Sequence, residues 1–174
     1  MAHRSSSSPT TALADRFGAK HLMGRIVHQA FEVLCPLRKP ADELFRPTTE
    51  HLPLAGQAGV AYCTAYLREL TDMADQFTFE PDMHGMVPDL EMYHRNRGYI
   101  VEVKTVWRDT HNGEIVKMFG KGQRQVRHGV SLMRQKTQDR MEIYGHVLAF
   151  VIYADGSPTE ALWVDVVHYV PPSA

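Results

Sequence analysis

The sequence predicts an α/β fold in one domain, a mixed β-sheet flanked by helices. Segments with helical periodicity alternate with short runs of β-branched and aromatic residues, which is typical of that class. Residues 147–154 form a continuous apolar run, as expected of a strand covered on both faces. A length of 174 residues, with 44% hydrophobic and 22% charged residues, is the size and composition of one globular domain.

The expected elements follow one another as helix, helix, strand, hairpin, helix, strand, strand. Pro36 would end the first helix, because a proline disfavours helical backbone at the residue before it. The helices are predicted at residues 13–35, 57–74 and 122–136, the hairpin at 85–105, and the other strands at 76–80, 147–154 and 161–170.

Two of these helices carry the apolar stripe of a helix that packs on a core. In 57–74 the stripe consists of Val60, Thr64, Leu67, Thr71 and Ala74. Three alanines of that helix are expected to pack closely beside it: Ala58, Ala61 and Ala65. In 122–136 the stripe consists of Val126, Val130 and Met133.

Compartment is predicted from the chain start, the cysteines and hydropathy. Residues 1–12 are interpreted as a disordered tail rather than a secretory signal, because no apolar segment follows, and residues 13–174 as the domain. Cys35 and Cys63 make neither a disulfide framework nor a cysteine metal site. No apolar run approaches membrane-spanning length. We therefore expect a cytoplasmic protein without a membrane partner.

Charge is unevenly distributed, although the net charge is only −1. Residues 117–140 hold seven basic side chains against one acid, Asp139. A local basic stretch can contact phosphates even in a nearly neutral chain, and it can equally be a solvated helix face. Both interpretations stay open. The basic residues are Lys117, Lys121, Arg124, Arg127, Arg134, Lys136 and Arg140.

The hairpin is the most informative stretch of the chain. Its arms flank residues 95–98, whose types tolerate a tight reversal. If Tyr93 pairs with Gly98, then Asp89 lies directly opposite Glu102. Side chains directly opposite in an antiparallel pair share a face.

The same register assigns the neighbouring residues to faces. A period of two puts Lys104 on the face of Glu102, and Val101 and Val103 on the other. Two carboxylates at that distance repel each other unless a cation lies between them, and their hard oxygen atoms suit Mg²⁺. The alternative is an ordinary exposed hairpin with solvated charges, which does not explain why Glu102 and Lys104 interrupt an apolar strand.

Pro88-Asp89, a gap of 12 residues and then Glu102-Val103-Lys104 resembles the signature of the PD-(D/E)XK nuclease superfamily. The resemblance covers the hairpin closely and the rest of the chain loosely. It implies a restriction-endonuclease-like fold with an αβββαβ core, which the predicted order matches apart from an extra helix and a final strand. Asp82 also follows a proline, but only Asp89 would lie opposite Glu102.

A second pattern, in residues 13–35, looks like the first motif of the RecB-like branch of that superfamily. Gly24, His28 and Glu32 fall at i, i+4 and i+8 on one helix stripe. The resemblance implies that His28, and with it Glu32, lies beside the hairpin and contributes to a metal shell. The alternative is a buried histidine bonded to Glu32. Two cysteines cannot hold the iron–sulfur cluster of some relatives.

Candidate substrate contacts lie after the hairpin. Many superfamily members place a glutamine on the next helix, followed by tyrosine at i+4; here Gln125 is followed by Gly129, a departure from the pattern. Trp107 could stack on a base or be a partly buried aromatic residue. We predict substrate contacts from Gln125, Arg124, Arg127 and Lys121.

These observations predict a Mg²⁺- or Mn²⁺-dependent deoxyribonuclease. Asp89 and Glu102 would hold the metal, Lys104 would orient the attacking water, and His28 and Glu32 would complete the shell. DNA is the expected partner, and a homodimer or a partner protein stays open. The alternatives are a non-catalytic nucleic-acid-binding or structural module on the same fold, and an interaction protein with a coincidental motif.

Overall fold

A computed structural model describes residues 52–79, 88–108 and 120–173. The predicted tail at 1–12 and the predicted helix at 13–35 lie outside these ranges. The described elements are α3 (Leu54–Asp72), β1 (Gln76–Phe79), β2 (Leu90–His94), β3 (Arg97–Arg108), α4 (Gly120–Lys136), β4 (Glu142–Tyr153) and β5 (Glu160–Tyr169). Among the described helices, none is long and apolar enough to cross a membrane.

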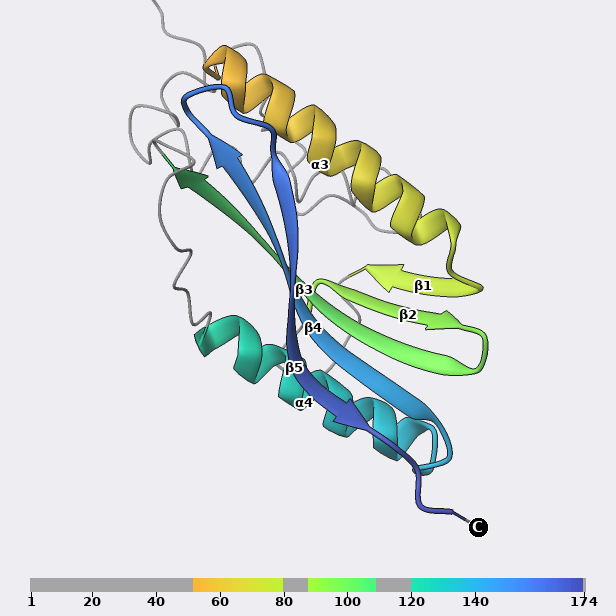
Figure 1. The fold of residues 1–174 in the computed structure, drawn as a ribbon. Helices are drawn as coiled ribbons and strands as arrows, with labels where there is room; N and C mark the ends of the chain where they lie inside the picture. The colour runs from red at the N-terminus through yellow and green to blue at the C-terminus, as the bar shows by residue number, and fades with distance from the viewer. Residues whose placement is uncertain (1–51, 80–87, 109–119, 174) are drawn as a thin grey trace, which may run out of the picture.

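The strands form one mixed sheet between two helices, which confirms the predicted α/β class. The strand order is β1-β2-β3-β4-β5, and only β3 and β4 are parallel. The crossover between them contains α4, as parallel neighbours require. Figure 1 shows α3 on one face of the sheet and α4 on the other.

The β2–β3 hairpin turns at two residues rather than at the four predicted. Arg95 and Asn96 have φ angles of 48° and 60°, as in the two-residue turn whose twist matches antiparallel strands. Arg97 and Gly98 already belong to β3. The predicted pairing of Tyr93 with Gly98 is confirmed.

The core between α3 and the sheet is apolar and continuous. Val101 and Val103 point into it, as predicted, and Trp107 packs against its edge as a partly buried aromatic residue. The predicted role of Ala58, Ala61 and Ala65 is wrong, because all three are exposed. Gly59 makes the close approach instead: a Cβ there would lie 2.5 Å from Ile152 Cγ2. The helix therefore presents Gly59, Val60, Cys63 and Leu67 to the sheet.

The second core cluster, between α4 and the sheet, confirms the predicted stripe of Val126, Val130 and Met133. Close packing depends here on glycines of both layers. A Cβ at Gly145 of β4 would lie 2.6 Å from Val126 Cγ1, and one at Gly129 of α4 would lie 2.9 Å from Ile100 Cγ2. These contacts bring α4 close to the sheet.

Strand β4 begins five residues before the predicted start at Val147. Its first half alternates polar and apolar residues, and the parallel register with β3 already holds at Arg97–Glu142. From Val147 to Tyr153 every residue is buried, as predicted for a strand covered on both faces.

Candidate functional site

The hairpin ladder ends at the pair Leu90–Val101, so Glu102 lies on β3 just past the last pair and Asp89 lies in a bend directly before β2. The predicted pairing of Asp89 with Glu102 is therefore not part of the ladder. The Asp89 carboxylate reaches β3, where its Oδ2 accepts a hydrogen bond of 2.7 Å from Val103 N–H.

Both acids are buried. Asp89 is 7% exposed and Glu102 is 2% exposed. Burial of ionised carboxylates is costly unless hydrogen bonds or cations stabilise them. The interpretation of an ordinary hairpin with solvated charges therefore does not describe Glu102.

Lys104 shares the α4 side with Glu102, as predicted. Its Nζ donates a hydrogen bond to Glu102 Oε1, and its side chain is 32% exposed. Lys104 therefore joins the buried carboxylate to solvent.

Helix α4 packs directly over this ion pair. A Cβ at Gly122 would lie 3.1 Å from Glu102 Cγ and 3.2 Å from Lys104 Cε. This role of Gly122 was not predicted from the sequence. Glycine leaves room at a position where any side chain would press on both charged residues.

A second buried carboxylate on the same side was also missed. Glu91 is 2% exposed, and its Oε1 accepts hydrogen bonds of 2.8 Å from Lys136 Nζ and from Tyr93 Oη. The hydrogen bond between Lys136 and Glu91 raises the pKa of Lys136. Strand parity could have revealed Glu91, because Asp89, Glu91 and Tyr93 are spaced by two.

The predicted substrate contacts lie on α4. Lys121, Arg124 and Arg127 are exposed, and Gln125 is half-buried. They lie in the half of the helix that contains Gly122. Two other cations of the basic stretch bind carboxylates of the protein itself: Lys136 binds Glu91, and Arg134 binds Asp139 at 2.8 Å.

The structure describes two of the four predicted metal ligands, Asp89 and Glu102. His28 and Glu32 lie outside the described residues. Within the described ranges, no three or more His, Cys, Asp and Glu side chains are grouped to hold a metal ion.

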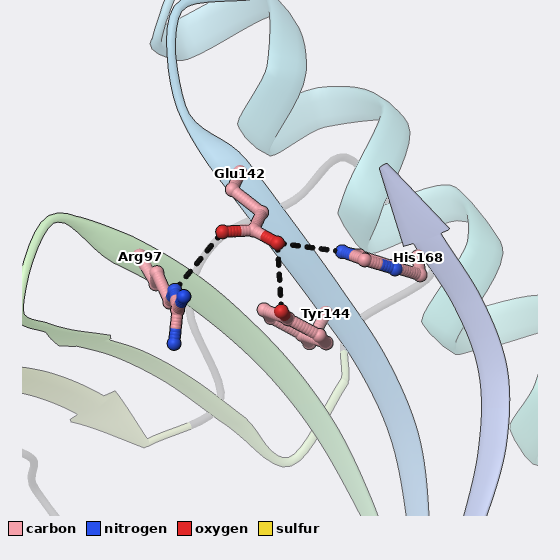
Figure 2. Close-up of polar contacts among 4 residues, drawn as sticks. All are labelled: Arg97, Glu142, Tyr144 and His168. Atoms are coloured by element: carbon pink, nitrogen blue, oxygen red, sulfur yellow. Dashed lines mark hydrogen bonds and ion pairs between the residues drawn. The ribbon is translucent and has the colours of Figure 1, made fainter. Parts of the chain in front are cut away.

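A separate polar cluster lies on the α3 side, at the start of β4. Figure 2 shows Arg97, Tyr144 and His168 around the carboxylate of Glu142. Glu142 accepts hydrogen bonds of 2.9 Å from Arg97 Nε and 2.7 Å from Tyr144 Oη, and His168 Nε2 lies 2.8 Å away. The contacts from Tyr144 and His168 lower the pKa of Glu142 to about 2. Glu142 thus ties β3, β4 and β5 together at the sheet end.

Comparison with known proteins gives no match for this chain, neither to a protein-family model nor to a curated sequence.

Proposed function

We propose that this protein is a Mg²⁺- or Mn²⁺-dependent nuclease that hydrolyses phosphodiester bonds of DNA, with a restriction-endonuclease-like fold. One observation carries the proposal: Asp89 directly before β2 and Glu102 on β3 are both buried, Asp89 bonds to β3 at Val103 N–H, and Lys104 contacts Glu102. The element order α3-β1-β2-β3-α4-β4 supports the fold assignment, with β5 added at the edge.

Each residue has a chemical role in this proposal. Asp89 and Glu102 would hold the divalent ion, which when bound supplies a water of lowered pKa and offsets phosphate charge. Lys104, with its amine between Glu102 and solvent, would orient the attacking water and stabilise negative charge on the phosphate as a point cation. His28 and Glu32 remain proposed members of the metal shell.

The substrate side of the proposal uses α4. Its exposed Lys121, Arg124 and Arg127 are near Gly122 in sequence, and Gly122 contacts the Glu102–Lys104 pair. They would contact phosphates, giving affinity that falls with salt and carries little base information. Gln125, half-buried on the same helix, would contact the substrate too.

The deciding experiment is a cleavage assay on plasmid, linear duplex and single-stranded DNA, with Mg²⁺, with Mn²⁺ and with chelator. We expect metal-dependent cleavage that falls at least about 100-fold in Glu102→Gln and Lys104→Met, because such charges act on the transition state. Cleavage that persists in chelator, or in both variants, would contradict the proposal.

The chain offers a matched control. Glu91→Gln and Lys136→Met alter another pair of a buried carboxylate and a lysine on the same side of the sheet. These variants should retain cleavage, whereas a general effect of disturbing buried ion pairs would reduce it equally. Metal titration of the protein and of Asp89→Ala then separates an enzyme from a non-catalytic module, which would show no difference in metal affinity.

A further inference from the structure

A pocket lies on the α3 side of the sheet, away from the Asp89–Glu102–Lys104 cluster. Its volume is about 270 Å³, and it forms where the C-terminal end of α3 meets β2, β3, β4 and β5. A cavity of about 150 Å³ holds benzene, so this one accommodates a ring with a substituent. Strand β3 contributes to both places, with Tyr99 in the pocket and Glu102 on the opposite face.

The walls of the pocket are apolar and aromatic. Leu70, Met73 and Met92 supply aliphatic and thioether surface, and Tyr99 and Trp163 supply rings. Met73 is 63% exposed and Trp163 is 39% exposed. Exposed large apolar side chains around a concavity mark binding surfaces, and methionine adapts to varied ligand shapes.

Trp163 is held in place by two neighbours. Its indole Nε1–H donates a hydrogen bond of 2.7 Å to Tyr66 Oη of α3. The ring meets the His146 imidazole edge to face, with 5.4 Å between centroids. Because the Trp163 side chain is already held in place, ligand binding does not have to immobilise it and loses no free energy in doing so.

The electrostatics of the pocket favour a positive ligand. Of the described residues that line it, none is lysine or arginine. The two histidines of the lining each face a carboxylate that lies outside the lining itself: His146 Nδ1 is 3.0 Å from Asp165 Oδ1, and His94 Nδ1 is 4.0 Å from Asp75 Oδ1. Burial lowers the pKa of His146, which favours the neutral form of this imidazole.

The end of α3 adds to this negative potential. The C-terminus of a helix carries partial negative charge, which a basic residue in the last turn usually offsets. The last turn of α3 contains no basic residue, and Met73 and Ala74 directly after it line the pocket. A cation bound here would take the place of the missing basic side chain.

We propose that this pocket binds a small organic cation, an ammonium group carried on an apolar body about one ring in size. The body occupies the space between Leu70, Met73 and Met92. The ammonium group lies towards Asp75 and Asp165, against the faces of Tyr99 and Trp163, which attract cations through their π-electrons. This site is independent of the proposed nuclease activity.

The test uses three probes of similar shape and different charge: benzyltrimethylammonium, benzyl alcohol and benzoate. Binding to the full chain is measured by ¹H–¹⁵N NMR and calorimetry. We expect the cation to bind about tenfold more tightly than the alcohol, with shifts at the pocket residues, and benzoate to bind more weakly still. Equal affinity for all three probes, or no shifts in the pocket, would overturn the proposal.

Variants sharpen this test. Asp165→Asn, at a side chain that is 92% exposed, should weaken binding of the cation about threefold and leave the alcohol unchanged. Ala74→Leu should block all binding by filling the cavity. Asp155→Asn, in the turn between β4 and β5, is the matched control and should bind like the native chain. If Asp165→Asn behaves like this control, the carboxylate does not contribute and the charge assignment fails; thermal melting confirms that each variant is folded.

Discussion

The two faces of the sheet bury very different side chains, although the same strands supply both. On the α3 side, the described part of β3 and β4 gives a packed apolar core, extended by aromatic rings. On the α4 side, apolar packing is interrupted by the buried carboxylates of Glu91 and Glu102, each paired with a lysine. Because desolvation of a buried ion pair offsets most of its attraction, folding gains little from charges on this face.

With the proposed site at Glu102, substitutions on the α3 side should act mainly on the free energy of unfolding, and substitutions around Glu102 mainly on cleavage. Substitutions on each face test this expectation.

The largest effect is expected for Phe150→Ala. Phe150 is fully buried on the α3 side, and its ring contacts Tyr66 edge to face with 5.5 Å between centroids. Its loss should lower the free energy of unfolding by about 3–5 kcal/mol in urea titrations. Leu54→Ala, at an 83% exposed position, is the control and should change it by less than about 0.5 kcal/mol. Similar effects for both would mean that this core is loosely packed.

The next effect tests the close packing of α4. In Gly145→Ala the new methyl group would lie 2.6 Å from Val126 Cγ1 and 2.7 Å from Val167 Cγ1, and should lower the free energy of unfolding by about 1–3 kcal/mol. Among the described residues, a methyl group at Gly120 would meet nothing closer than 3.7 Å, so Gly120→Ala should be neutral or stabilising. A neutral Gly145→Ala would show that the helix can move away from the sheet.

Gly122→Ala should separate activity from stability. The added methyl group would press on Glu102 Cγ and Lys104 Cε, while alanine favours the helix itself. We expect cleavage to fall about tenfold, equivalent to about 1.4 kcal/mol, with a smaller change in the free energy of unfolding. Single-turnover cleavage and urea titration measure the two quantities. Unchanged cleavage with lowered stability would remove Gly122 from the site.

The smallest effect concerns the exposed cluster around Glu142. A carboxyl whose pKa falls from 4.5 to about 2 on folding contributes stability that is present above pH 4.5 and is lost as the pH falls through about 2. The difference in stability between the native chain and Glu142→Gln should therefore be constant near pH 6 and shrink between about pH 4.5 and 2. Glu69→Gln on α3 is the control, and a pH-independent difference would contradict the assigned cause.

Local patterns predicted much of the described fold. Strand parity gave the face of Val101 and Val103 and the pairing of Tyr93 with Gly98, because turn and alternation together determine a hairpin register. Helical periodicity likewise gave the buried stripe of α4. Both signals depend only on neighbours in the sequence.

Other features depend on contacts between distant residues and could not be predicted in this way. The positions at which glycine is required, Gly59 and Gly122, are set by side chains of β3 and β4 that pack against them. The start of β4 at Glu142 follows from its pairing with Arg97. The pocket at the end of α3 is formed by four strands and a helix together, so it cannot be recognised in the sequence of any single segment.

The parallel pairing of β3 with β4 has a consequence for the order of folding. Strands β2 and β3 are joined through a two-residue turn, so closing their hairpin orders few residues and is fast. The β3–β4 pairs link residues 45 positions apart, and the entropy of closing that long loop must be overcome before those contacts form. We therefore expect the β2–β3 hairpin to form early and β4 to pair with β3 late.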